Sequence, residues 1–296
     1  MLNIIFDNAI MIHWKYYAVC METEDLMEII NKDIDHGKAF DWGKTSEDYA
    51  RFRDIYPNAF YEKLAELSLG IKGQNALDIG TGTGVIPRNM YSYGAKWTGA
   101  DISENQIFYA QKLSAESGME IDYIVASAEQ VDFPENTFDV ITACQCFMYF
   151  DKAIVLPKIH RMLKRKGHFA ILFMAWLPGE SEIAKNSEDM VLKYNPSWTG
   201  GGMTRYELQE PPWCGDRFRA ANVLTYDLPV HFTREAWHGR MKACRGIGAS
   251  GLSEKEIAAW EQEHWMYMQS LPEEFDILHY VTILDLEKKE MERSML

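Results

Sequence analysis

Three glycines spaced two apart, Gly80, Gly82 and Gly84, are the residues whose type and spacing most clearly indicate a ligand site. They follow an apolar stretch at residues 76–79, and residues 85–93 are typical of the beginning of a helix. Glycine has no Cβ, so its backbone can lie close against a ligand, and the N–H groups at the start of a helix are free to bind one. The pattern predicts a strand, a cofactor-binding turn and a helix in that order.

The spacing of the glycines separates two kinds of cofactor. The dinucleotide fingerprint G-x-G-x-x-G would have its third glycine where this chain has Val85. The run that begins at Asp78 instead reads D-x-G-x-G-x-G and resembles motif I of the class I S-adenosylmethionine-dependent methyltransferases. The resemblance covers most of residues 38–286 and implies S-adenosylmethionine as the cofactor. The turn residues implied to hold it are Asp78, Gly80, Thr81, Gly82, Thr83 and Gly84.

Two other classes of function stay open on the sequence alone. An NAD-dependent oxidoreductase would use the glycine turn for a pyrophosphate, and the mismatched third glycine disfavours it. A non-catalytic sensor or scaffold that binds S-adenosylmethionine is the other alternative, because a fold does not fix a function.

A second acidic residue, Asp101, ends the next apolar stretch, 21 positions after Gly80. An acid at the end of this strand accepts hydrogen bonds from the hydroxyls of a ribose. Ser103 follows with Gln106 three residues later, a spacing that predicts a capping box at the start of a helix. We therefore expect Asp101, Ile102 and Gln106 to lie at the cofactor.

Two later stretches bear on the cofactor site. Residues 126–134 resemble the family's adenine-binding segment, which is usually Gly-Asp-Ala followed by an acid or amide, although Ser127 replaces the common Asp. The resemblance implies contacts from Ser127, Ala128 and Glu129, with the contact to the adenine amino group weakened or supplied by Glu129 or a water. Cys144 and Cys146 have no Cys or His pair nearby for a zinc site, so we predict no metal and expect apolar, core or cofactor-lining thiols, with Cys144 at the cofactor.

Residues 49–57 form a second recognisable cluster in the N-terminal third of the chain. They resemble the Tyr…Arg-x-x-Tyr-Pro stretch of methyltransferases that act on small molecules. The resemblance implies that Tyr49 and Arg53 meet the methionine carboxylate of the cofactor and help to close the site, which suits a guanidinium fork. A solvated amphipathic helix with an ordinary ion pair is the alternative.

The candidate substrate residues include one arginine. Arg240 shares a helical stripe with Trp237 and Met241, and this stripe should face inward. An inward arginine needs an anion, either a structural Asp or Glu, which we favour, or a substrate carboxylate. Residues 237–249 are also similar to the C-terminal part of methyltransferases of the trans-aconitate methyltransferase type. The other candidate substrate contacts are Trp42, Met148 and Trp213.

The sequence does not identify a catalytic base. Many relatives carry a His-Trp pair where this chain has Met148 and Tyr149, so no histidine is available there. Tyr149 and His264 are the candidates, although a lone histidine beside aromatic residues is more often a packed, hydrogen-bonded group. Methyl transfer from a sulfonium is mainly a positioning task, and a carboxylate acceptor would arrive deprotonated.

The elements that must position these residues alternate along the chain. Further strands are predicted at residues 121–126, 138–143, 168–176, 223–232 and 275–286, with a helix at 152–164. Alternating strands and helices indicate a doubly wound α/β fold, and the resemblance implies a mostly parallel, seven-stranded, Rossmann-like sheet.

The chain divides into five predicted segments. They are an N-terminal extension (1–37), a helical lid over the cofactor (38–72), a cofactor-binding core (73–176), an inserted substrate cap (177–222) and C-terminal helices and strands that complete the sheet (223–296). Residues 1–20 are apolar but interrupted by charges, which fits neither a signal peptide nor a membrane span. We expect them to pack on a partner subunit or to be a start-site artefact.

Composition limits the partners. The 296 residues are 47% hydrophobic, enough for one large core with an appendage, and the net charge is −14 with no basic tract for phosphates. Nucleic acid and membrane are therefore unexpected partners, and a small molecule is the expected substrate. Five cysteines without framework spacing suit a reducing, cytoplasmic location. Monomer and homodimer both stay open.

Overall fold

The computed structural model describes residues 29–290. The expectations for residues 1–20 therefore lie outside the described residues. The last part of the predicted N-terminal extension is described, and it packs on the fold: Ile29 and Phe40 form an antiparallel bridge, and the Asp35 carboxylate accepts the Thr199 N–H at 2.8 Å.

One seven-stranded sheet organises the chain, with strand order β3-β2-β1-β4-β5-β7-β6. Strands β1 to β5 pair in parallel, whereas β7 runs antiparallel to both β5 and β6. The predicted fold, a doubly wound and mostly parallel sheet, is confirmed. The strands are β1 (Asn75–Ile79), β2 (Lys96–Asp101), β3 (Asp122–Val125), β4 (Phe138–Cys144), β5 (Leu163–Trp176), β6 (Phe218–Thr233) and β7 (Glu274–Lys288).

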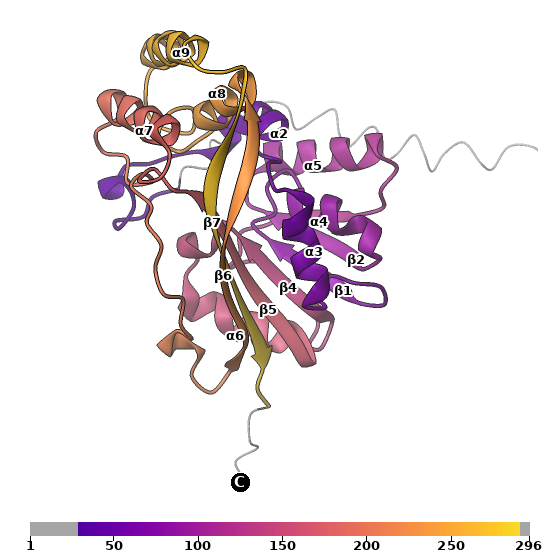
Figure 1. Cartoon of the computed structure of the whole chain (residues 1–296). Helices are drawn as coiled ribbons and strands as arrows, with labels where there is room; N and C mark the ends of the chain where they lie inside the picture. Colours follow the sequence, from indigo (N-terminus) through magenta and orange to yellow (C-terminus); the bar gives the residue numbers. More distant parts are fainter. Residues whose placement is uncertain (1–28, 291–296) are drawn as a thin grey trace, which may run out of the picture.

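Helices cover both faces of the sheet and one end of it (Figure 1). Helices α3 and α4 pack on one face, α6 lies on the other, and α7, α8 and α9 gather beyond the upper ends of β6 and β7. The α-helices are α2 (Ser46–Phe52), α3 (Asn58–Glu66), α4 (Val85–Met90), α5 (Glu104–Glu116), α6 (Lys152–Met162), α7 (Glu182–Tyr194), α8 (Arg234–Lys242) and α9 (Glu254–Gln269). The short 3₁₀ helices are η1 (Asp35–Gly37), η2 (Trp42–Thr45), η3 (Tyr91–Tyr93), η4 (Phe147–Tyr149) and η5 (Pro212–Cys214).

The core consists of two apolar clusters, one on each face of the sheet. Alternate residues of a strand point to opposite faces, so Val140 joins the cluster under α3 and α4 while Ile141 joins the cluster under α6. Strands β1 and β4 are buried on both faces and read as near-continuous apolar runs. This burial fixes the carboxyl ends of the parallel strands relative to one another.

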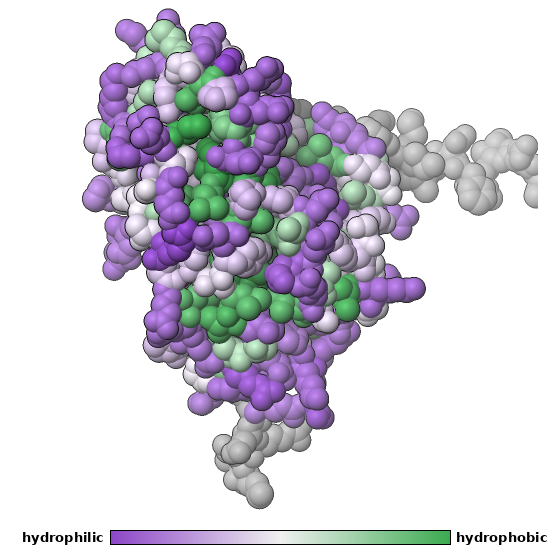
Figure 2. Space-filling view, in the orientation of Figure 1, coloured by the Kyte–Doolittle hydropathy of each residue, from purple (hydrophilic) through white to green (hydrophobic). Residues whose placement is uncertain are grey.

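The segment predicted as an inserted cap is divided differently. Strand β6 begins at Phe218, inside the predicted cap, because its inward positions alternate with exposed ones through residue 233. The cap range also contains α7, which packs against α9. Figure 2 shows apolar surface across the middle of the face that carries β6 and β7, with hydrophilic margins. Among residues 29–290, no helix combines the length and apolar character needed to cross a bilayer.

Candidate functional site

A cavity of about 290 Å³, here called the main cavity, lies where four neighbouring parallel strands end. Gly80 follows β1, Asp101 ends β2, Ala126 follows β3 and Cys144 ends β4, and all four residues line the cavity. In open parallel sheets, ligands bind at the carboxyl ends of the strands, next to the point where strand order reverses. The order β2-β1-β4 places that point between β1 and β4.

The glycine turn between β1 and α4 depends on left-handed backbone. Gly80 has φ +70°, and a Cβ there would lie 2.6 Å from the Cys146 sulfur. Gly84 has φ +75°, and a Cβ there would lie 2.3 Å from the hydroxyl oxygen of Tyr123. Gly80 and Gly82 line the main cavity, whereas Gly84 allows the helix start to pack against the sheet.

Asp101 closes the next side of the main cavity. Its two carboxylate oxygens accept hydrogen bonds from the Gly82 N–H at 2.8 Å and the Ser103 N–H at 2.9 Å. Burial raises the pKa of Asp101, and these two backbone donors oppose the rise. A carboxylate has about four acceptor sites, so it can still accept two hydroxyl donors.

The predicted capping box at the start of α5 is only half formed. The Ser103 hydroxyl accepts the Gln106 N–H at 3.3 Å, as predicted. The Gln106 side chain does not return to the Ser103 N–H, because that group already bonds Asp101. Its amide instead donates to the Trp42 carbonyl at 3.2 Å, so α5 is tied to the N-terminal segment at the cavity wall.

The loop after β3 forms another wall. Ser127, Ala128 and Glu129 all line the main cavity. The Ser127 hydroxyl accepts the Gln130 N–H at 3.3 Å and so stabilises its own turn. A Glu129 oxygen accepts the Asp151 N–H at 2.8 Å.

The N-terminal segment supplies an aromatic wall. Trp42 in η2 and Tyr49 in α2 meet edge to face, with ring centroids 5.9 Å apart. The Arg53 guanidinium lies 4.6 Å from the Tyr49 centroid and 5.7 Å from that of Trp42. All three residues line the main cavity, so this segment closes it from outside the sheet.

A second, smaller cavity of about 30 Å³, here called the arginine cavity, shares Tyr49, Arg53, Gly80, Cys144 and Gln145 with the main cavity. Thr81 from the glycine turn and Arg240 from α8 also line it.

Arg240 corrects one expectation. A structural carboxylate partner is the interpretation favoured by the sequence, but within residues 29–290 Arg240 forms no ion pair and its Nε and Nη1 atoms have no hydrogen-bond partner. The guanidinium instead lies 4.8 Å from the Trp176 ring centroid. Burial lowers the pKa of Arg240 to about 9, and the nearby charge of Arg53 adds to the effect.

The thiols of the main cavity and the hydroxyl of Tyr149 are held neutral. Burial raises the pKa of Cys144 to about 12 and that of Cys146 well above its ordinary value. Burial also raises the pKa of Tyr149, against the opposing charge of Arg245, which donates to the Tyr149 hydroxyl at 2.9 Å. None of these groups is a ready base or nucleophile at neutral pH.

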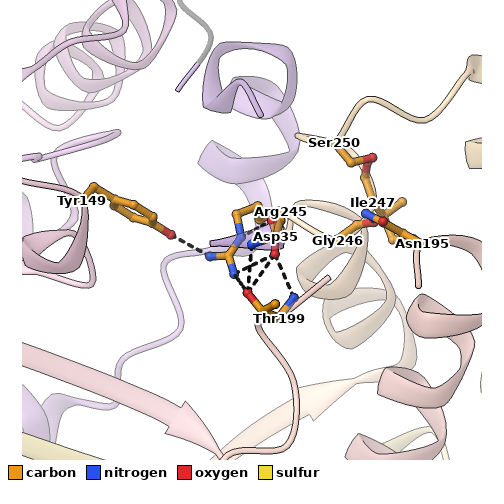
Figure 3. A network of polar contacts seen from close by, with 8 residues as sticks. All are labelled: Asp35, Tyr149, Asn195, Thr199, Arg245, Gly246, Ile247 and Ser250. Atoms are coloured by element: carbon orange, nitrogen blue, oxygen red, sulfur yellow. Dashed lines mark hydrogen bonds and ion pairs between the residues drawn. The ribbon is translucent and has the colours of Figure 1, made fainter. Parts of the chain in front are cut away.

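Behind Tyr149 lies a polar network, shown in Figure 3. Arg245 donates to Asp35 at 2.5 Å, and Asp35 in turn accepts the Thr199 N–H at 2.8 Å. The network borders a third cavity of about 400 Å³, here called the lysine cavity, whose charged lining residues are Asp35, Lys38, Lys44 and Arg245. Phe40 also lines it and contacts Tyr149, which lines the main cavity, with ring centroids 5.6 Å apart.

Most predicted site residues are brought together by the fold. Those that line the main cavity are Trp42, Tyr49, Arg53, Gly80, Gly82, Asp101, Ile102, Gln106, Ser127, Ala128, Glu129, Cys144 and Tyr149. Thr81 and Arg240 line the arginine cavity.

Three residues of the predicted turn, Asp78, Thr83 and Gly84, lie away from the cavities. Asp78 is buried beneath the turn, where the Thr142 hydroxyl donates to it at 2.6 Å; burial raises its pKa to about 7, against that hydrogen bond. Thr83 is fully buried, and Gly84 faces Tyr123. None of the three lines the main or the arginine cavity, because only the first half of the turn faces the strand ends.

Met148, Trp213 and His264 are not at the cavities. Met148 lies on η4 and is 41% exposed, and Trp213 packs against Phe147 with ring centroids 5.3 Å apart. His264 is fully buried between α7, α8 and α9, sharing hydrogen bonds with His238 Nδ1 at 2.8 Å and the Ser187 hydroxyl at 3.0 Å. Burial lowers the pKa of His264 to about 3, and it cannot serve as the base of this site.

Several lining residues were not predicted. Ile29, Gln145 and Phe150 line the main cavity, and Tyr56 lines the arginine cavity. Gln145 directly follows β4 and has φ +64°, but a glutamine at this position does not indicate a left-handed backbone. Tyr56 belongs to the Tyr-Pro pair of residues 49–57, so the resemblance of that stretch could have predicted it as a site residue.

Comparisons with known proteins agree on one family. Residues 77–171 match the family described as a methyltransferase domain. A ubiquinone biosynthesis O-methyltransferase of Pseudomonas aeruginosa is 30% identical over 145 residues, 46% of this chain and 61% of its own length. A Dictyostelium discoideum protein named as a methyltransferase is 27% identical over 151 residues, 51% of this chain and 54% of its own length. The chain thus spans little more than half the length of these curated relatives.

A solved structure shares the fold. A Bacillus halodurans protein described as a methyltransferase superposes with a TM-score of 0.50 at 16% identity, covering 78% of this chain and 99% of its own. This likeness concerns the arrangement of the sheet and helices.

Proposed function

We propose that this chain, which belongs to the class I S-adenosylmethionine-dependent methyltransferases, transfers a methyl group from that cofactor to an oxygen of a small carboxylate-bearing molecule. The observation that carries the proposal is the main cavity itself. It combines a glycine turn after β1 with an acid at the end of β2, and the described residues that line it include no histidine or lysine that could deprotonate an acceptor.

The described residues fit the cofactor. A nucleoside suits the groove between Asp101 and the loop after β3, where the carboxylate can accept ribose hydroxyls and the backbone of Ala128 can meet the base. Gly80 supports a close approach, since any side chain there would fill the space beside Cys146. Residues 38–72 act in this proposal as the lid, through Trp42, Tyr49 and Arg53. The cofactor supplies a methyl group already activated on a sulfonium sulfur.

The lining residues favour an acceptor that arrives deprotonated. Among the described residues of the main cavity there is no histidine or lysine, and the carboxylates are Asp101 and Glu129, at the nucleoside side. The neutral thiols beside β4 do not compete for the methyl group. A carboxylate acceptor is ionised at neutral pH, so the site has only to align it and exclude water. The relatives named as O-methyltransferases support oxygen as the accepting atom.

The charge beside the main cavity also favours an anionic acceptor. The lysine cavity presents Lys38 and Lys44 near Arg245, against one acid, Asp35, that is already paired. This local excess of positive charge stands in a chain with a net charge of −14, and such an excess in a cleft attracts anions. We propose that the acceptor's acidic group approaches through this cavity.

The decisive experiment measures transfer of a labelled methyl group from S-adenosylmethionine to a panel of small acids, with phenols and amines as comparison. We expect a base-labile methyl ester on one of the acids. The variant Asp101→Ala should lose about tenfold or more in affinity for S-adenosylhomocysteine, because one charged acceptor is removed. Binding of the cofactor without product from any acid, phenol or amine would favour the sensor or scaffold alternative.

The lysine cavity gives a separate test of the acceptor. The double variant Lys38→Gln, Lys44→Gln should raise KM for the acid severalfold and leave the affinity for S-adenosylhomocysteine unchanged, since neither lysine lines the main cavity. The matched control is Lys193→Gln in α7, an exposed residue paired with Glu263. An unchanged KM in the double variant would contradict this route.

A further inference from the structure

Arg240 is a buried cation that has no compensating anion among residues 29–290. Its residue is 6% exposed, and Nε and Nη1 make no hydrogen bond to any described residue. It comes from α8, outside the matched methyltransferase domain at residues 77–171. An uncompensated buried charge destabilises a fold, so a guanidinium kept in such a place indicates an anion that binds there.

A second guanidinium lines the same small cavity. Within residues 29–290, Arg53 forms no ion pair, and its side-chain hydrogen bond is a 3.4 Å contact to the Tyr49 hydroxyl. Both arginines therefore present positive charge to the arginine cavity, where no described carboxylate lines the wall. Two like charges that share a low-dielectric space repel each other, and an anion between them would relieve both.

The size and position of the arginine cavity indicate which anion fits. Its volume of about 30 Å³ is room for a group the size of one or two waters, such as a single carboxylate, and not for a whole acceptor molecule. It adjoins the main cavity at Gly80 and Cys144, which line both. These two residues lie at the ends of β1 and β4, beside the glycine turn, so the arginine cavity is next to the place where a cofactor on that turn would lie.

We propose that Arg240, together with Arg53, binds the carboxylate of the cofactor's amino-acid group in the arginine cavity, and not an acceptor carboxylate. The proposal rests on S-adenosylmethionine being the cofactor. It adds a ligand from α8 to those that the glycine turn and the lid supply. Binding of the cofactor then also ties the C-terminal helices to the ends of β1 and β4.

The test compares three nucleosides by calorimetry on the whole chain: S-adenosylhomocysteine, its decarboxylated analogue, and 5′-methylthioadenosine, which lacks the amino-acid group. Arg240→Leu should weaken S-adenosylhomocysteine by about ten- to a hundredfold and leave the other two unchanged, because only the first carries the carboxylate. Arg240→Lys should recover part of the loss. Without ligand, Arg240→Leu should unfold at the same or a higher denaturant concentration, since a buried unpaired charge is removed.

The control is Arg219→Leu, an exposed arginine on edge strand β6 that pairs with Glu287, and it should alter none of the three affinities. Equal weakening of S-adenosylhomocysteine and its decarboxylated analogue by Arg240→Leu would show a structural role and overturn the proposal. An effect of Arg240→Leu on the acceptor KM alone would overturn it in favour of an acceptor site. If the unaltered protein bound none of the three nucleosides, the cofactor assignment itself would fall.

Discussion

At the scale of single residues, the three motif glycines have different tasks. Gly80 leaves space beside a cavity-lining thiol, whereas Gly84 leaves space for the hydroxyl of Tyr123, which is itself hydrogen-bonded to Ser114 at 3.0 Å. The spacing of the glycines identifies the turn, but it does not tell which glycine faces the ligand. The difference depends on what packs against each one from other strands and helices.

This difference gives a stability prediction. Gly84→Ala should lower the free energy of unfolding by about 2–4 kcal/mol, since it combines a left-handed φ with a close contact to Tyr123. Gly118→Ala is the matched control, because Gly118 has φ +65° with nothing within 4 Å of its Cβ position, and it should cost only about 1 kcal/mol. Urea unfolding measures both. Equal losses in the two variants would mean that Tyr123 moves aside freely.

At the scale of elements, helices α7, α8 and α9 are joined by a buried polar network. His264 of α9 bonds the Ser187 hydroxyl of α7, which also accepts the Trp237 indole N–H of α8 at 2.9 Å. The rings of His238, Trp260 and His264 contact one another in the same layer, with centroids 4.7–5.4 Å apart. The sequence favours a packed, hydrogen-bonded histidine on the aromatic side of α9. The hydrogen bonds of His264 to His238 and Ser187 agree with this interpretation.

The network makes the helical layer sensitive to acid. The pKa of His264 is lowered from 6.5 to about 3 by burial, so between these values the unfolded chain binds a proton that the folded chain does not. Stability should therefore fall as the pH drops below about 6.5, by about 1.4 kcal/mol per pH unit for this group. His264→Gln should be less stable than the parent at pH 7, and the difference should shrink by about 2 kcal/mol at pH 5.

The measurement is urea unfolding of both proteins at pH 7, 6 and 5. His231→Gln serves as the control, because the His231 side chain is 61% exposed at the end of β6. A constant difference between parent and His264→Gln over this range would show that His264 titrates normally in the folded state.

At the scale of the whole molecule, the N-terminal segment links the cavities to the C-terminal helices. Asp35 and Arg245 are separated by 210 positions yet form a pair whose side chains are 6% and 13% exposed. Arg245 also bonds Tyr149 at the main cavity, as Figure 3 shows. This pair therefore connects the lid side of the main cavity to the loop after α8.

Breaking the pair should loosen the N-terminal segment. Asp35→Asn should lower the free energy of unfolding by about 3 kcal/mol, because it leaves Arg245 largely buried without its counter-charge. Amide hydrogen exchange should become faster in residues 29–41, and affinity for S-adenosylhomocysteine should fall, since Ile29 and Trp42 line the main cavity. Glu235→Gln breaks the exposed Arg51–Glu235 pair and should cost less than about 1 kcal/mol. A similar effect of both variants would contradict this account.

Local sequence determined the sheet, the glycine turn, the acid at the end of β2 and the resemblance to methyltransferases, because these features depend on residues close together in the chain: periodic apolar stretches, φ-specific glycines and short motifs at strand ends. The tertiary structure decided the rest. It placed Arg240 where none of the described carboxylates pairs with it, left Met148, Trp213 and His264 outside the three cavities, and brought Ile29 and Gln145 to the wall of the main cavity. The packing of helices and loops on the finished sheet decides which residues meet across tens or hundreds of positions. Local sequence patterns do not indicate such contacts.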